Sequence, residues 1–357
     1  MNARIAGVLL VLLAALGGGA LLVQQQRGAE RPAGAGALGQ PVLKGLQAAG
    51  IGAIVIREPG ATLTLQKKAE RWTLAERGGF PADVDKVREL VLKALELKVG
   101  QSEPIGEKDR ARLKLDGSGT TLEFLGADGK PLARLAVGSK VFKKAPENPA
   151  FAAGDGRFVQ LPEDPKSALV VADPLALAST RSTEWIDRTG FAAEKVRSLE
   201  IVLQGAEKWS IERARDDAGW KLSPSRAGEK LDTMRANSAS YSLNSVALAD
   251  VAAPGLKAAD TGLERPFATI VARTFDGLTY TVKLGKPAGD NYHAAVAVAG
   301  EPKAGGPDAA ERQKLIAARL PAERALAAHT LLIAKSKFDD ILKKRAELLE
   351  KKDAGRK

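Results

Sequence analysis

Two histidines, His293 and His329, are the only imidazoles in a chain of 357 residues that contains no cysteine. Serine hydrolases of the common type need a histidine base beside the nucleophile, and the Gly-x-Ser-x-Gly turn that presents such a serine is absent from the sequence. Zinc sites are built chiefly from cysteine and histidine, and two isolated histidines without an HExxH pair do not make one. We therefore predict no catalytic, cofactor-binding or metal-ligating residues, and we expect both histidines to pack on or beside strands.

The stretch from Gly117 to Thr121 reads Gly-Ser-Gly-Thr-Thr and superficially looks like a phosphate-binding loop. It lacks the lysine of the P-loop pattern and does not stand between a strand and a helix. Apolar and polar residues alternate on both sides of it, at 113–115 and 121–125. We therefore expect a hairpin turn here.

Two aspartate–arginine pairs recur at a spacing of three, Asp85 with Arg88 and Asp232 with Arg235. On a helix this spacing brings the two side chains together as a solvated ion pair worth about a few tenths of a kcal/mol. Acid–base catalysis would require a second carboxylate converging on either aspartate, which sequence spacing does not reveal. We expect both pairs to lie on helix surfaces.

The elements around these residues occur twice. Trp220 follows Trp72 by 148 positions, and Gly285 follows Gly138 by 147. In each copy a strand-like stretch ends near the tryptophan, a helix-like segment follows, and an Asp-Gly turn leads into a strand that ends at the glycine. We expect each tryptophan to anchor a core between strand and helix, with ligand stacking as the alternative. The unit is the size of a domain and too long for a solenoid repeat.

The predicted fold class is α+β, with two duplicated antiparallel-sheet-plus-helix units behind an N-terminal transmembrane helix. Alternating segments predict the strands, and apolar residues at helical spacing over 84–95 predict a helix that lays one face on a sheet. The predicted parts are a signal-anchor transmembrane helix at 1–23, a flexible linker at 24–40, a first unit at 41–183, a second unit at 184–335, and a C-terminal amphipathic helix and tail at 336–357.

The N-terminal segment from Ile5 to Val23 is uncharged for 19 residues, enough to span a hydrocarbon layer of about 30 Å. Arg4 precedes it, and the short tail before it favours export of the rest of the chain. We expect a single-pass protein of the bacterial inner membrane with its bulk in the periplasm. The alternative is cleavage after Ala20 and secretion.

Composition limits the partners of the chain. The net charge is +11, with 54 Lys and Arg against 43 Asp and Glu, but the basic residues are interspersed with acids and form no dense block. We therefore expect no specific binding of nucleic acid. The absence of cysteine excludes disulfides, thiolate nucleophiles and a cysteine-linked lipid anchor.

Several short motifs together resemble one family. In the first copy they are Trp72-Thr73-Leu74, Pro81-Ala82-Asp83 and Leu135 to Gly138; in the second, Gly219 to Leu222, Gly262 to Pro266 and Val282 to Gly285; outside the copies, Trp185 to Thr189 and Lys337 to Arg345. This pattern is similar to the bacterial domain-of-unknown-function family 4340. One departure is that the first copy has Ile105 to Lys108 where the second has Gly-Leu-x-x-Pro.

The resemblance implies a single-span exported protein associated with ABC-type export systems of the gliding-motility kind, and it supplies no catalytic residues. We therefore expect a membrane-anchored, non-enzymatic binding or accessory module whose partners are the inner membrane and ABC transporter subunits, with an unknown ligand. The alternative is a cell-envelope hydrolase or carbohydrate-active enzyme with an atypical carboxylate site.

Overall fold

The structure, a computed structural model, describes residues 37–148, 152, 154–303, 305 and 308–351. Within these ranges no helix is long and apolar enough to cross a membrane, and the transmembrane helix predicted at 1–23 lies outside them. The described chain divides into two compact units. One contains the residues up to Thr62 with Arg88–Thr180, and the other contains Leu63–Val87 with the residues from Arg181 onward.

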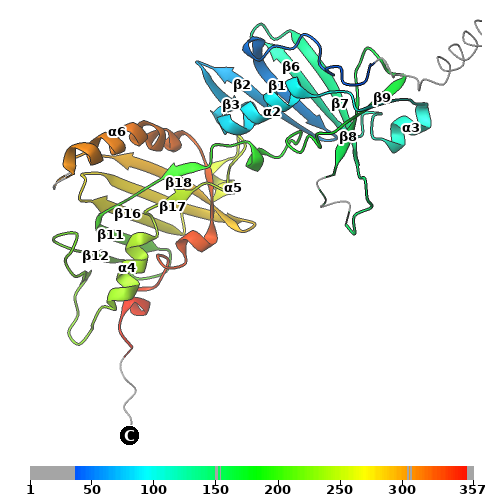
Figure 1. The fold of residues 1–357 in the computed structure, drawn as a ribbon. Coiled ribbons are helices and arrows are strands. Elements are labelled where there is room, and N and C mark those ends of the chain that lie inside the picture. Colours follow the sequence, from blue (N-terminus) through cyan, green and yellow to red (C-terminus); the bar gives the residue numbers. More distant parts are fainter. Residues whose placement is uncertain (1–36, 149–151, 153, 304, 306–307, 352–357) are drawn as a thin grey trace, which may run out of the picture. The chain divides into compact units, whose positions relative to one another are not determined.

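The first sheet has nine strands in the order β4-β3-β2-β1-β6-β7-β8-β9-β5 (Figure 1). Its strands are β1 (Ile51–Glu58), β2 (Ala61–Lys68), β3 (Arg71–Leu74), β4 (Phe80–Pro81), β5 (Gln101–Pro104), β6 (Thr120–Gly126), β7 (Pro131–Val141), β8 (Gly156–Gln160) and β9 (Ser167–Val171). Burial alternates strictly along β6, which is the period of two that the sequence predicts.

Two α-helices accompany this sheet. Helix α2 (Val84–Glu96) buries Val87, Leu90 and Ala94, as its apolar spacing predicts. Helix α3 (Glu107–Arg112) lies near β8 and β9 in Figure 1. The residues that follow it, Leu113 and Leu115, join a small apolar cluster with strand residues of β7, β8 and β9.

The hairpin predicted around Gly117 is wrong on one side. Residues 113–115 form the turn that ends α3, and only the stretch after the glycines is a strand. Lys114 adopts a left-handed conformation with φ of 57°, which turns both neighbouring leucines into the core. An apolar-polar-apolar triplet fits this helix end as well as it fits a strand, so the short pattern is ambiguous.

The second sheet has eight strands in the order β13-β12-β11-β16-β17-β18-β19-β15. They are β11 (Val196–Leu203), β12 (Trp209–Glu212), β13 (Lys221–Ser223), β15 (Asp250–Val251), β16 (Ala268–Thr274), β17 (Thr279–Ala288), β18 (Asn291–Ala299) and β19 (Leu331–Ala334). Its α-helices are α4 (Thr233–Tyr241), α5 (Ala258–Thr261) and α6 (Ala309–Ala325). A separate pair joins β10 (Thr189–Phe191) to β14 (Val246–Ala247).

The two sheets follow one plan. The order β3-β2-β1-β6-β7-β8-β9-β5 in the first sheet matches, strand for strand, the order β13-β12-β11-β16-β17-β18-β19-β15 in the second. Matched strands also follow one another in the same sequence along the chain. The main difference is α6, which stands between β18 and β19, whereas a loop of six residues (161–166) joins β8 to β9. Mostly antiparallel sheets with few helices confirm the α+β class.

The tryptophans that anchor the core are not the predicted ones. Trp185 and Trp209 are fully buried, whereas Trp72 and Trp220 are only partly buried. Trp220 immediately precedes β13, the terminal strand of its sheet, so less of the fold covers it. Its Nε1 donates to Oδ1 of Asn237 at 2.9 Å, as expected for an indole at the margin of a core.

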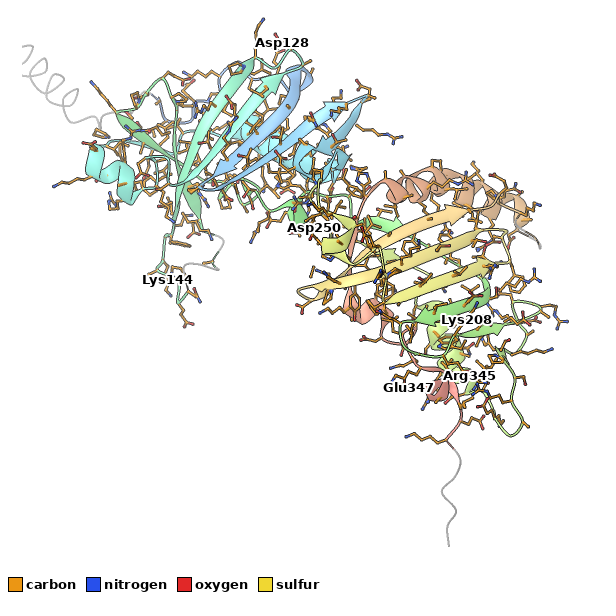
Figure 2. The ribbon with its side chains drawn as sticks, turned by 180° about the vertical axis from the view of Figure 1, so that it is seen from behind. Asp128, Lys144, Lys208, Asp250, Arg345 and Glu347 are labelled. Carbon is orange, nitrogen blue, oxygen red and sulfur yellow. The ribbon has the colours of Figure 1, made fainter. Side chains whose placement is uncertain are left out.

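The prediction of a C-terminal amphipathic helix is also wrong. Residues 336–351 contain the short 3-10 helices η6 (Lys335–Phe338) and η7 (Arg345–Leu348) in place of one α-helix. Phe338, Ile341 and Leu348 are buried as their spacing predicts, but the segment is held by contacts along its length. Arg345, labelled in Figure 2, donates to Glu229 at 2.8 Å and to the carbonyl of Pro224 at 2.6 Å. Such distributed anchoring favours a bent path over a straight helix.

Candidate functional site

The two histidines have separate partners. His293 lies on β18, and its Nδ1 is 2.9 Å from the carbonyl oxygen of Lys286. His329 packs edge-on against the ring of Phe80 with ring centroids 5.0 Å apart, and burial lowers its pKa. His329 therefore packs beside a strand, as expected from the sequence, and His293 lies on a strand with its ring in contact with a backbone carbonyl.

Of the two aspartates singled out by spacing, Asp232 serves a helix end, whereas Asp85 lies exposed in the first turn of α2. Asp232 is the N-cap of α4, where its Oδ1 accepts from the backbone N–H of Arg235 at 3.2 Å, and its Oδ2 pairs with Nε of the same arginine. In α2 the corresponding acceptor is Asp83, which bonds the N–H of Asp85 at 3.1 Å. Capping satisfies backbone donors that a helix leaves unpaired. These carboxylates are therefore structural.

Other carboxylates hold α6 in place. Asp276 is buried and accepts twice from Nε of Arg312 at 3.0 Å. Glu323 is also buried, accepting from the N–H of Ala192 at 3.0 Å and from the hydroxyl of Tyr280 at 2.8 Å. Burial and the neighbouring glutamate raise the pKa of Tyr280. Because these carboxylates already have partners, the cluster fixes a helix and is a poor general acid or base. In the described ranges no group of three potential ligands is arranged to hold a metal.

The second unit contains a cavity of about 710 Å³, here called the strand-end cavity. Strands β11, β16, β17 and β18 end or begin there, beside α5. Cavities of this size are typical of small-molecule sites. Its lining residues are Gln204, Ala259, Gly262, Glu264, Arg265, Phe267, Gly285, Lys286, Pro287 and Tyr292.

Two glycines bring α5 directly onto β17 at this cavity. A Cβ at Gly285 would lie 2.1 Å from the carbonyl oxygen of Thr261, the last residue of α5. Gly262 follows with φ of 74°, and a Cβ there would lie 2.8 Å from the backbone nitrogen of Lys286. Only glycine permits so close a backbone approach. The wall of the cavity therefore depends on these two glycines.

Aromatic rings and charges line the rest. The rings of Phe267 and Tyr292 lie 5.0 Å apart, and Lys335 places its Nζ 5.7 Å from the Tyr292 ring centroid. Lys286 donates its Nζ to the carbonyl of Ala259 at 3.0 Å. This lining suits a partly apolar group that stacks on rings and presents a polar end to the charged rim.

Residues 72–266 match a family described as Domain of unknown function (DUF4340), and the match covers more than half of the chain. The chain belongs to this family. This confirms the resemblance that its short motifs indicate. Comparison with curated proteins and with solved structures found no match.

The DUF4340 match ends at Pro266, within the segment from Gly262 that forms a wall of the strand-end cavity. The sequence motifs contain Gly262 and Gly285 but do not show that these glycines enclose a cavity. They also do not identify Phe267 and Tyr292 as residues of its lining. The signal was available in part, because a glycine at a helix end and another at a strand end indicate a close backbone approach.

The first unit shows where the counterpart of Gly-Leu-x-x-Pro lies. A Cβ at Gly138 would lie 2.2 Å from the carbonyl oxygen of Leu113, the same type of contact that Gly285 makes with Thr261. The left-handed residue that follows is Lys114 in this unit and Gly262 in the other. The counterpart is therefore the turn after α3, and the expectation that Ile105 to Lys108 takes this place is wrong.

Proposed function

We propose that this protein is a non-enzymatic, extracytoplasmic binding module that residues 5–23 hold on the bacterial inner membrane, where it acts as an accessory to an ABC-type transport system. The strand-end cavity is its binding site. The observation that carries the proposal is the cavity itself: about 710 Å³, walled by rings and by a glycine-dependent backbone contact. The transport role is supported by the family resemblance.

The proposal includes an origin by duplication. Two sheets with the same strand order and the same glycine-to-carbonyl contact support descent from one ancestral module. Duplication lets one copy keep the framework while the other acquires a binding surface. A cavity of this size in the second unit supports ligand binding there.

The chemistry of the lining favours binding over turnover. General acid–base catalysis requires a group whose proton is free to transfer to the ligand. At the strand-end cavity the Lys286 amine is engaged with a backbone carbonyl, and Glu264 and Arg265 lie exposed at the rim. Apolar walls with a few polar groups at the opening are typical of recognition sites.

Co-purification of the full chain from detergent-solubilised membranes tests this function. We expect transporter subunits to accompany the wild-type protein in fixed stoichiometry. Tyr292→Ala and Arg265→Glu should weaken this association because each alters the cavity or its rim. Tyr241→Ala is the matched control, since Tyr241 is 55% exposed on α4 and does not line the cavity.

Recovery of the wild-type chain without transporter subunits would contradict the accessory role. Equal loss in the Tyr241 and Tyr292 variants would contradict the assignment of the cavity. The Arg265 variant guards against a folding defect, because its side chain is exposed and its replacement removes no core contact.

A further inference from the structure

A second hollow lies in the first unit and has a different chemistry. This basic cavity has a volume of about 290 Å³ and adjoins the Gly-Ser-Gly-Thr-Thr stretch. The residues that matter for its charge are Arg110, Lys114, Asp116 and Arg134. It is separate from the strand-end cavity, and the inference drawn from it does not rest on the proposed function.

Three elements bring the cations together. Arg110 comes from α3, Lys114 from the turn that ends it, and Arg134 from β7. The N–H of Leu115 bonds the carbonyl of Arg110 at 2.8 Å, which folds the turn back on the helix. A Cβ at Gly119 would lie 2.2 Å from the carbonyl oxygen of Lys114, so this glycine lets the loop close against the turn.

The charges at the cavity do not cancel. Asp116 is the acidic residue in its lining, against three basic ones. Its Oδ1 accepts from the hydroxyl of Ser118 at 2.5 Å and from the backbone N–H of the same serine at 3.1 Å. These bonds, with a smaller contribution from Arg110, lower the pKa of Asp116, so it stays ionised at neutral pH. A net excess of two positive charges remains.

Arg110 provides the second, independent observation. Its Nε is buried and finds no hydrogen-bond partner among the described residues. A buried, unsatisfied donor on a charged group is costly, and natural structures usually supply it with an acceptor. An anion in the basic cavity would offset the excess positive charge that this side chain and its neighbours carry.

We propose that the basic cavity binds a phosphate group. Guanidinium groups match the geometry of phosphate oxygens through paired N–H donors, and lysine adds a point charge. A cavity of about 290 Å³ compares with about 30 Å³ for one water in the liquid, so there is room for a phosphate and a small group attached to it. The phosphate can come from a soluble phosphomonoester or from a lipid headgroup.

Calorimetric titration of the full chain in neutral detergent with inorganic phosphate tests the site. We expect saturable binding that weakens about tenfold in Arg134→Ala, the loss typical of one charge-assisted hydrogen bond. Arg110→Ala should lose at least as much. Arg112→Ala is the matched control on the same helix, because Arg112 is exposed, pairs with Asp109 and does not line the cavity. Its affinity should equal that of the wild type.

Lys114→Gly distinguishes a loss of binding from a loss of folding. Glycine suits the left-handed conformation at this position, so the variant removes a charge without straining the turn. It should fold and bind phosphate more weakly. Competition by glycerol 3-phosphate would assign the ligand to the soluble class, and competition by phosphatidylglycerol nanodiscs, with phosphatidylcholine nanodiscs as the control, would assign it to the lipid class. Failure of the wild type to bind phosphate saturably, or an equal loss in Arg112→Ala, would overturn the proposal.

Discussion

The turn after α3 in the first unit and the turn after α5 in the second occupy the same place in the two sheets and differ in what surrounds them. Each brings a backbone carbonyl against a glycine of the following sheet, Leu113 against Gly138 and Thr261 against Gly285. In the first unit two leucines join an apolar cluster beside the turn, and cations line a smaller cavity. In the second, aromatic rings surround an open cavity. The backbone contact therefore fixes how the turn packs on the sheet, and the side chains beside it determine which ligands could bind.

A second contrast lies at the Asp-Gly turns. Asp128, at the tip of the β6–β7 hairpin in Figure 2, is exposed and accepts from the N–H of Lys130 at 3.1 Å. Asp276 stands at the corresponding turn of the second unit but is buried against Arg312 of α6. One position thus closes a turn in the first unit and secures a helix in the second.

The largest expected effect comes from the shared contact. Gly138→Ala and Gly285→Ala each place a Cβ within 2.2 Å of a backbone oxygen, so each should cost about 3 kcal/mol of unfolding free energy or more. Urea denaturation followed by circular dichroism measures this. A large loss of unfolding free energy in one glycine variant and none in the other would show that the contact does not stabilise both units.

The next effect separates the two Asp-Gly turns. Asp276→Ala leaves the Arg312 guanidinium without its main partner and should cost about 3 kcal/mol, as for other buried pairs broken on one side. Hydrogen exchange should show faster opening of α6 in this variant. Asp128→Ala is the control and should leave both unfolding and exchange nearly unchanged. Equal changes in unfolding and exchange for the two variants would contradict the different roles assigned to Asp276 and Asp128.

A smaller effect reverses sign between the units. Gly262→Ala adds a side chain at φ of 74° with a backbone nitrogen 2.8 Å away, and should destabilise the protein by about 2 kcal/mol. Lys114→Gly relieves a left-handed conformation and should raise stability by about 0.5 kcal/mol. Thermal unfolding of the two variants measures the difference. Destabilisation by both substitutions would argue against equivalent turns.

The smallest effect concerns His329. Burial holds its pKa below the ordinary value of 6.5, so the unfolded chain binds the proton more readily than the folded chain. This contribution is present above the unfolded pKa of about 6.5 and is lost as the pH falls from there through the lower folded pKa. Stability of the wild type should therefore decline more steeply over this range than that of His329→Gln. Parallel curves for the two proteins would contradict the assignment.

Local patterns predicted much of the sheets. The alternation at 121–125 predicted β6, and the stretch from Tyr292 to Ala299 predicted β18 almost to the residue, because side chains of a half-buried strand repeat every second position. The triplet at 113–115 misled because three residues fit a strand or a helix end equally. Burial of tryptophan followed position in the sheet, which the local pattern around Trp72 does not contain.

The two cavities could not be predicted from the sequence, for a different reason. The strand-end cavity is assembled from residues between Gln204 and Tyr292, which only the folded sheet brings together. The basic cavity likewise needs β7 to place Arg134 opposite α3. The stretch from Gly117 to Thr121 was interpreted as a turn only, because no pattern within it shows the cations that fold around it.

Site-specific photo-crosslinking in intact membranes tests whether the strand-end cavity contacts an ABC transporter subunit. A benzophenone side chain in place of Tyr292 stands in the strand-end cavity, and the same group in place of Tyr241 stands on an exposed face of α4. We expect an adduct with an ABC transporter subunit from position 292 and none from position 241. Adducts from position 241 alone, or no transporter adduct from position 292, would contradict this expectation.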